Sequence, residues 1–303
     1  MNNEEALINY VVEICYKNGL GKVWSCKRQN IGFNRIVYNV NDMFVIKICI
    51  NYEKESGIIN EIQYYVDNPN YFTPRLITYD ISKEAIPFIY TIEEKINGNN
   101  LFNVWGNLDE TQREHCLNEL VQILKKIHKP TKQKNEAIAN ILLKYDEYLS
   151  RLKLSGLLLP DQVGYLNELR NVLTFYFENA SFGFTHGDIH FNNIIYSEEG
   201  LGLIDFECYD IAPLDKDFDS INRMVRNPNS LLKKGLQLSV NPKDYERIIP
   251  YLIKDYPEVC KKDNFENRLL IYDCINSLKW LKFYPEYKPY RDILFVKSKK
   301  LIK

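Results

Sequence analysis

One stretch of the chain, residues 184–207, gathers side chains suited to phosphoryl transfer. Asp188 is followed five residues later by Asn193, and Asp205 comes near the end of the stretch. In phosphoryl transfer the charge of the transition state spreads over the transferred group, so catalysis depends on positioning and charge neutralisation. We predict that Asp188 orients an acceptor hydroxyl and takes its proton. Asn193 and Asp205 are the predicted ligands of Mg²⁺, which prefers hard oxygen atoms.

A β-hairpin must bring these residues together. Apolar residues at 194–196 and 201–204 predict two strands, and Ser197–Gly200 predicts the turn between them. Such a hairpin returns Asp205 to the neighbourhood of Asn193. In the alternative interpretation the segment is a surface loop with solvated acids, which leaves the apolar runs beside each acid unexplained.

Two motifs of this stretch, HGDxHxxN at 186–193 and IDFE at 204–207, resemble those of aminoglycoside phosphotransferases and choline kinases. These families are small-molecule kinases that share the protein-kinase fold. The protein-kinase signature is H-R-D-x-x-x-x-N with D-F-G, and this chain has Gly187 in place of the arginine and Glu207 in place of the last glycine. The resemblance implies that ATP or GTP with Mg²⁺ supplies the phosphoryl group and that a small hydroxylated molecule accepts it.

The N-terminal part predicts a small lobe rich in strands. Apolar residues at helical spacing over 4–18 predict a helix that ends at Gly19. Residues 22–40 and 43–50 are rich in β-branched and aromatic side chains and predict strands joined by a turn at Asn41 and Asp42. Two further strands are predicted at 73–79 and 86–96.

The loop Asn30–Arg35 lies where a phosphate-covering loop belongs, although it holds a single glycine and no G-x-G-x-x-G pattern. By itself it is equally well a plain hairpin turn. It resembles the G-F-N-x-x-x-Y version of this loop in small-molecule kinases. That resemblance assigns Gly32, Phe33 and Asn34 to nucleotide binding.

Lys47 stands alone as a charge in the apolar strand 44–48. A buried ammonium needs an anionic partner. Kinases pair such a lysine with the nucleotide phosphates and with an acid on the next helix. We choose Glu61 as that acid and keep Glu55 as the alternative. A lysine on an edge strand that faces water is the other interpretation.

The segment Asn97–Asn100 breaks the strand pattern and predicts a hinge between two lobes. We expect an α+β, protein-kinase-like bilobal fold. Residues 1–96 form the nucleotide-binding lobe with a small antiparallel sheet, and residues 101–303 form a larger, mainly helical lobe for catalysis and acceptor binding.

Helical periodicity dominates after Thr111. Asp109 and Gln112 form a predicted capping box for the first helix of this part, and His128 at the end of that helix is predicted to pack. Residues 129–138 are polar and predict a loop. Further helices are predicted over 139–153, over 161–179 and between 220 and 303.

Charge and aromatic residues bear on the acceptor. Between Asp188 and Asp219 there are nine acids and one base, Lys216. Mg²⁺ needs some of these acids and a cationic acceptor explains others, so Glu207 and Asp210 are predicted to face its amines. A crowded set of aromatics is predicted to be core, with a cage for a quaternary ammonium group as the alternative. The set is Trp280, Phe283, Tyr284, Tyr287 and Tyr290.

Further roles follow from the resemblance alone. It implies that His190 supports the phosphate side and that His186 and Asp217 are structural, Asp217 bracing the catalytic loop. Only nine residues separate Glu207 from Asp217, which leaves no room for the regulatory loop of a protein kinase and disfavours protein substrates. The backbone groups that would meet the nucleobase belong to Glu94, Lys95 and Ile96.

Composition excludes several classes of protein. The 303 residues carry a net charge of -1, so no basic field points to nucleic acid. Seven cysteines without a C-x-x-C pair predict reduced thiols. The acidic N-terminus lacks the apolar core of a signal peptide, and no segment reaches the roughly 18 apolar residues of a membrane span. We expect a cytoplasmic monomer that binds neither nucleic acid nor membrane.

The sequence is compatible with several acceptors and with more than one activity. Aminoglycosides, choline or ethanolamine, and other metabolite alcohols all suit an acidic site. Aminoglycosides, and with them antibiotic resistance, are favoured because the match runs from Gly32 to Asp217. A nucleotide-binding scaffold without catalysis and a protein kinase are the other hypotheses. Neither ATP nor GTP is preferred.

Overall fold

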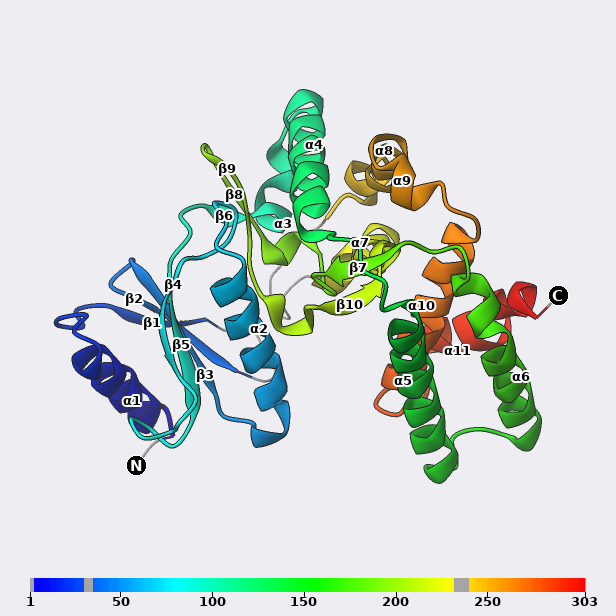
Figure 1. Ribbon diagram of the computed structural model, residues 1–303, viewed down its shortest axis with the longest axis horizontal. Coiled ribbons are helices and arrows are strands. Elements are labelled where there is room, and N and C mark those ends of the chain that lie inside the picture. Colours follow the sequence, from blue (N-terminus) through cyan, green and yellow to red (C-terminus); the bar gives the residue numbers. More distant parts are fainter. Residues whose placement is uncertain (1–2, 30–34, 232–239, 303) are drawn as a thin grey trace. The chain divides into compact units, whose positions relative to one another are not determined.

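The computed structural model describes residues 3–29, 35–231 and 240–302 (Figure 1). The chain divides into two compact units, one made of residues 1–104 and 191–209 and the other of residues 105–190 and 210–303. Gly32, Phe33 and Asn34, predicted to bind the nucleotide, lie outside the described residues. Among the described helices, none is at once long and apolar enough to traverse a bilayer.

A five-stranded antiparallel sheet forms the centre of the first unit, in the strand order β1-β2-β3-β5-β4. The predicted turn between β2 and β3 falls at Asn41 and Asp42, whose φ angles of 56° and 53° are tolerated by these two residue types. The strands are β1 Cys26–Gln29, β2 Ile36–Val40, β3 Phe44–Cys49, β4 Leu76–Asp80 and β5 Ile89–Glu94, and the helices are α1 Asn3–Lys17 and α2 Glu55–Asp67.

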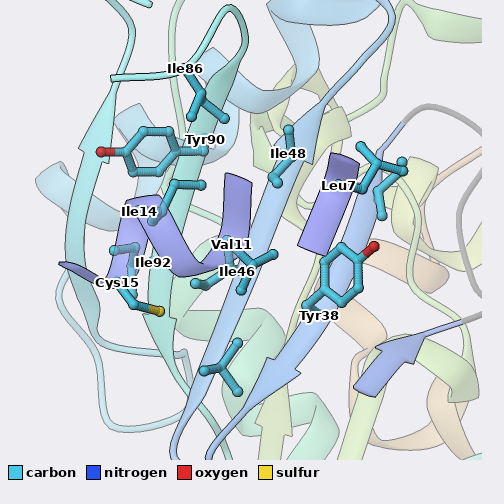
Figure 2. Packing of buried hydrophobic residues seen from close by; sticks show 12 residues of the cluster. Leu7, Val11, Ile14, Cys15, Tyr38, Ile46, Ile48, Ile86, Tyr90 and Ile92 are labelled. Atoms are coloured by element: carbon cyan, nitrogen blue, oxygen red, sulfur yellow. The ribbon is translucent and has the colours of Figure 1, made fainter. Parts of the chain in front are cut away.

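Helix α1 covers one face of this sheet (Figure 2). Leu7, Val11 and Ile14 recur at helical spacing and pack in one cluster with Ile46 and Ile48 of β3. The two isoleucines are two positions apart and therefore point to the same face of the strand. The predicted N-terminal helix thus forms because its apolar stripe fits this face.

Helix α2 covers the opposite face. Its Ile58 and Ile62 pack with Cys49 of β3 and Ile89 of β5. Because side chains alternate along a strand, Lys47 lies on the same face as Cys49 and so beneath α2. The pleat of β3 therefore directs the lone lysine of this strand towards the helix that carries the predicted acidic partner.

The predicted hairpin is present in the first unit as β8 Ile194–Ser197 and β9 Gly200–Leu203. The Ile204 N–H donates to the Asn193 carbonyl at 3.0 Å, so Asn193 and Asp205 stand at the same end of the hairpin. A short strand, β6 Asn99–Asn100, pairs with β8, so half of the segment predicted as a hinge is in a strand. Helix α3, Leu101–Val104, follows it.

The second unit is mainly helical, with β7 and β10 paired antiparallel. The predicted capping box is present, since Asp109 Oδ1 accepts from the Gln112 N–H at 2.8 Å and Gln112 Oε1 accepts from the Asp109 N–H at 2.9 Å. Its elements are α4 Glu110–Ile127, α5 Lys134–Leu154, α6 Pro160–Phe177, β7 Phe182–Thr185, β10 Asp210–Pro213, α7 Asp217–Arg226, α8 Ile248–Asp255, α9 Pro257–Cys260, α10 Phe265–Leu281 and α11 Lys288–Phe295.

Two expectations for this unit are wrong. The loop predicted at 129–138 is shorter, because α5 already begins at Lys134 and its first turn tolerates polar residues. The aromatic set near the C-terminus is not core: Phe283, Tyr284 and Tyr287 are exposed. They follow Leu281, the last buried residue of α10. The rings of Phe283 and Tyr284 contact Trp280, and the ring of Tyr287 contacts Tyr290.

Candidate active site

A cavity of about 390 Å³ lies within the first unit. Its lining includes Lys47, Asn193 and Asp205, three of the residues predicted to handle phosphate and metal. The other lining residues are Gln29, Arg35, Val37, Asn39, Val45, Pro74, Glu93, Glu94, Lys95, Ile96, Gly98, Asn99, Asn100, Asn192, Ile195, Ile204 and Glu207. Charged groups and apolar side chains thus line one cavity.

The predicted pair of Lys47 and Glu61 is present in this unit. Lys47 Nζ lies 2.6 Å from Glu61 Oε1, and the Glu61 side chain is fully buried. The same oxygen accepts hydrogen bonds from the Tyr65 hydroxyl at 3.1 Å and from the Phe206 N–H at 3.3 Å. Glu55, the alternative partner, instead pairs with Lys83 at 2.7 Å. The two acids lie nearly two helical turns apart, and only Glu61 is on the buried side of α2.

Glu93 is a second buried acid that sequence reasoning missed. Its Oε2 lies 3.0 Å from Lys47 Nζ, and its Oε1 accepts from the Thr91 hydroxyl at 2.9 Å. Thr91 stands opposite Lys47 in the ladder, so Glu93, two residues further, shares that face. The signal was an acid on the Lys47 face of an otherwise apolar strand, where a buried charge needs a partner. The neighbouring Glu94 is exposed and pairs with Arg75 at 2.8 Å.

Arg35 is the second cation of this cluster and was also missed. Its guanidinium pairs with Glu61, with Glu207 at 2.6 Å and with Asp205 at 3.5 Å, and the side chain is 6% exposed. The position gave a signal, because a lone arginine directly before the apolar strand β2 must find a buried anion. Arg35 therefore links α2 to the residues that follow the hairpin.

The charges of this cluster set the pKa values of its acids. Burial favours the protonated form of Glu61, but Lys47 and Arg35 outweigh burial and hold the pKa of Glu61 below its ordinary value. Burial and the nearby Glu61 raise the pKa of Glu93, against the opposing effect of Lys47. Partial burial of Asp205 and the Glu61 carboxylate likewise raise the pKa of Asp205. Glu61 therefore carries the charge that balances both cations.

The end of the hairpin offers oxygen donors that fit Mg²⁺. Asn193 directly precedes β8 and Asp205 follows β9, and both line the cavity. Asp205 has a left-handed backbone with a φ of 69°, which is unusual for a residue other than glycine and is often found at functional sites. Mg²⁺ is commonly held by one or two carboxylates together with phosphate oxygens. One amide, one carboxylate and a cavity with room for phosphates match that pattern.

The three residues predicted to meet the nucleobase also line the cavity. The Glu94 N–H donates to the Arg75 carbonyl at 2.9 Å and the Lys95 N–H donates to the Met43 carbonyl at 2.8 Å. Both donors therefore serve the sheet, which makes the Ile96 N–H the candidate donor to a base. Apolar Ile195 and Ile204 line the same cavity and suit a planar ring.

The predicted catalytic loop lies in the second unit and is held by Asp217. Asp217 Oδ2 accepts from the His186 N–H at 2.9 Å, and Oδ1 accepts from the Gly187 N–H at 2.6 Å. Gly187 has a φ of 83°, which explains why glycine replaces the arginine of the protein-kinase motif. His128 Nε2 lies 2.9 Å from Asp217 Oδ2, so this histidine packs at the helix end as predicted.

The Asp188 carboxylate lies close to the side chains of Ser220 and His190. The Ser220 hydroxyl donates to Asp188 Oδ1 at 2.8 Å. His190 Nε2 lies 3.7 Å from Asp188 Oδ2. Burial lowers the pKa of His190, and Asp188 offsets this only in part. Ser220 lies 32 residues from Asp188, and no sequence pattern connects the two.

Comparison with known proteins decides the family. Residues 63–231, more than half of the 303-residue chain, match the phosphotransferase enzyme family. The chain belongs to that family. No curated protein matches it significantly.

Solved structures establish the fold of this phosphotransferase. The streptomycin–ATP ternary complex of APH(2″)-IIa is 15% identical. The match covers 100% of this chain and 96% of that one, with a TM-score of 0.66. The ADP-bound aminoglycoside phosphotransferase APH(2″)-Ib is 16% identical. The match covers 100% of this chain and 97% of that one, with a TM-score of 0.66. The GDP and kanamycin complex of APH(2″)-IIia is 14% identical, and the match covers 97% of this chain and 98% of that one, with a TM-score of 0.65.

These findings confirm the predicted family, the kinase-like α+β fold and the enzyme class. The protein is a phosphotransferase.

Two acids of the acid-rich segment of this phosphotransferase are paired with bases. Asp215 pairs with the fully buried Arg268 at 2.5 Å, and Asp219 pairs with Arg223 and Lys216. Arg268 and Arg223 lie beyond the end of the segment, so the count of charges within the segment overstated its negative charge.

The two acids predicted to face acceptor amines differ in their surroundings. Glu207 belongs to the first unit and is engaged by Arg35. Asp210 belongs to the second unit, is exposed, and accepts from the Ile211 N–H at 2.7 Å.

Proposed function

We propose that this phosphotransferase transfers the γ-phosphoryl group of ATP or GTP to a hydroxyl of a small cationic molecule of the aminoglycoside type. The observation that carries the proposal is the buried pair of Lys47 and Glu61 in the unit whose cavity also holds Asn193 and Asp205. Kinases need such a pair to hold the nucleotide phosphates. The structural neighbours named above are described with ATP, ADP or GDP and with streptomycin or kanamycin, which supports both halves of the proposal.

The nucleotide side of the reaction belongs to the first unit in this proposal. Lys47, oriented by Glu61, contacts the phosphates, and the Ile96 N–H meets the base beside Glu94 and Lys95. Asn193 and Asp205 hold Mg²⁺, which when bound neutralises charge on the phosphates. Gly32, Phe33 and Asn34 keep their assignment to the phosphate-covering loop.

The catalytic loop supplies the base. The Asp188 carboxylate takes the proton of the acceptor hydroxyl as the acceptor oxygen forms a bond to the γ-phosphorus. The bond between that phosphorus and the bridging oxygen breaks, and the nucleoside diphosphate leaves with the electron pair. His190 supports the phosphate side, and His186 and Asp217 keep the loop in shape.

The cationic character of the acceptor rests on a smaller set of acids than the sequence suggests. Asp215 and Asp219 are neutralised by arginine and lysine partners. Asp210 is exposed and therefore the better candidate for an amine contact. Glu207 is retained as the second candidate, with Arg35 as a competing partner.

The remaining assignments complete the proposal. Residues 1–96 form the nucleotide-binding lobe, residues 97–100 the hinge and residues 101–303 the lobe for catalysis and acceptor binding. The protein acts as a monomer in the cytoplasm, in keeping with its seven free thiols. Phosphorylation of an aminoglycoside would give antibiotic resistance.

Nucleotide consumption by the purified protein tests the function. We expect turnover with Mg-ATP or Mg-GTP and at least one member of a panel of aminoglycosides, with choline and ethanolamine as the competing acceptors. Turnover with choline or ethanolamine alone would instead identify the protein as a metabolite kinase. Nucleotide binding without any turnover would leave only a scaffold.

Asp188→Asn tests the base. We expect it to abolish transfer while the affinity for Mg-ATP stays within about twofold, because an amide keeps the shape but cannot accept the proton at neutral pH. Asp161→Asn, the same change at an exposed position of α6, is the matched control and retains turnover. Near-normal turnover of Asp188→Asn would remove Asp188 from the mechanism.

A further inference from the structure

Helix α7 touches the catalytic loop at two places. Asp217, at its start, binds the loop backbone through the His186 and Gly187 N–H groups. Ser220, one turn later, binds the carboxylate of Asp188 through its hydroxyl at 2.8 Å. Ser220 is 5% exposed, so this hydroxyl is shielded from competing water. The backbone of the loop and the side chain of its proposed base are therefore held by separate residues of one helix.

The direction of the Ser220 hydrogen bond follows from its other partner. Arg223 Nη2 donates to Ser220 Oγ at 2.8 Å. Arginine has no acceptor, so the hydrogen of the serine hydroxyl cannot point to Arg223. It is left to Asp188 Oδ1, which accepts it. The arginine thus orients the hydroxyl as a donor to the carboxylate.

Arg223 is itself fixed on the same helix. It pairs with Asp219, whose side chain is 1% exposed and which also pairs with Lys216. The positions are three and four residues apart, the spacing at which side chains of a helix meet. Contacts therefore run from Lys216 through Asp219, Arg223 and Ser220 to the carboxylate of the proposed base.

We propose that Ser220 is a positioning residue for Asp188, oriented for this task by Arg223. The inference rests on the proposed function, in which Asp188 is the base. A bond to one carboxylate oxygen restricts rotation of the carboxylate and so sets the direction of its lone pairs. A base must hold the acceptor proton within hydrogen-bond reach, and misplacement by a fraction of an ångström lowers the rate of the chemical step.

Removal of the Ser220 hydroxyl leaves the loop itself supported. The two bonds from Asp217 to the loop backbone remain, and alanine is favourable within a helix. Ser220→Ala therefore separates the orientation of the carboxylate from the shape of the loop. Ser220→Thr keeps a hydroxyl and is the conservative variant.

The test uses Mg-ATP with water as the acceptor, so it does not depend on the identity of the natural acceptor. We expect Ser220→Ala to lower kcat for phosphate release about tenfold, with KM and the dissociation constant of Mg-ATP within about twofold. Ser220→Thr recovers most of kcat. Arg223→Met lowers kcat to a smaller extent, because the hydroxyl keeps its bond to Asp188 but loses its orientation. Arg226→Met, on the same helix and paired with Asp273 at 2.5 Å, is the matched control and leaves kcat unchanged.

A double variant separates positioning from a general structural effect. In an Asp188→Asn background, Ser220→Ala should cause no further loss of single-turnover phosphate release, since it acts through Asp188. An equal loss in both backgrounds, a raised KM or an unchanged kcat in Ser220→Ala would overturn the proposal. Normal turnover of Asp188→Asn alone would instead remove Asp188 from the proposed mechanism, and no turnover in the unaltered protein would refute the proposed function, so these failures are distinguishable.

Discussion

The two units hold their clustered acids by different means. In the first unit two cations, Arg35 and Lys47, face four carboxylates, those of Glu61, Glu93, Asp205 and Glu207. In the second unit Asp217 accepts from backbone N–H groups and lies beside His128, Asp219 has two basic partners, and Asp215 has Arg268.

This difference suits the two tasks proposed for them. An excess of carboxylates in the first unit leaves room for a divalent cation, and its arginine and lysine suit added phosphates. In the second unit each buried acid is satisfied by the protein itself, so the catalytic loop has its shape before any ligand arrives. Preorganised polar groups of this kind lower the cost of reaching the transition state. The comparison predicts that changes in the second unit affect stability most and changes in the first affect ligand binding most.

The largest effect is expected from Asp217→Ala. It leaves His128 and the His186 and Gly187 N–H groups without their buried acceptor, so the free energy of unfolding should fall by about 3–5 kcal/mol. Urea unfolding measures it. Asp210→Ala, at an exposed position of the same unit, is the control and should change it by less than about 0.5 kcal/mol. A loss below about 1 kcal/mol for Asp217→Ala would show that the loop does not depend on this residue.

Glu61→Gln should weaken Mg-ATP binding by about 2–3 kcal/mol, because Lys47 and Arg35 lose the charge that orients them. Isothermal titration calorimetry measures the change. Glu55→Gln is the matched control, since Glu55 is on the same helix but pairs with Lys83. Equal affinities of the two variants would contradict the role of Glu61.

Arg35→Met should weaken Mg-ATP binding about tenfold and leave adenosine binding unchanged, because a cation in the cavity acts on the phosphates and not on the base. Titration with both ligands gives the ratio. Arg28→Met, an exposed arginine of β1, serves as the control. A parallel loss of adenosine affinity would mean that Arg35 supports the cavity as a whole.

The smallest effect concerns pH. The His128 partner and the backbone donors hold the pKa of Asp217 below its ordinary value of 3.8, although burial opposes them. As the pH falls, Asp217 is therefore protonated in the unfolded chain before it is protonated in the folded protein. The stability that this carboxylate contributes is fully present above its ordinary pKa and is lost as the pH falls through its pKa in the folded protein. We expect at most about 1 kcal/mol less stability from this group at about pH 3 than at about pH 6, and a flatter profile for Asp217→Asn. Identical profiles would assign the loss to other acids.

Local sequence was sufficient for the elements that frame the site. Alternating and helical periodicity predicted the strands around Lys47, the hairpin 194–204 and the capping box of α4, because these depend on neighbours a few residues away. The rule that a buried charge needs a partner also predicted the contact of Lys47 with Glu61, within one strand and the next helix.

The sequence by itself determined which residue types stand near the hairpin and the catalytic loop, and so the class of chemistry. Only the tertiary structure decided how their charges are balanced. Arg35 meets Glu207 across 172 positions and Arg268 meets Asp215 across 53. Ser220 meets Asp188 across 32. Contacts between such distant residues cannot be predicted from periodicity in the sequence. Which base pairs with which acid is decided by how whole helices and strands pack, and not by local conformational preference.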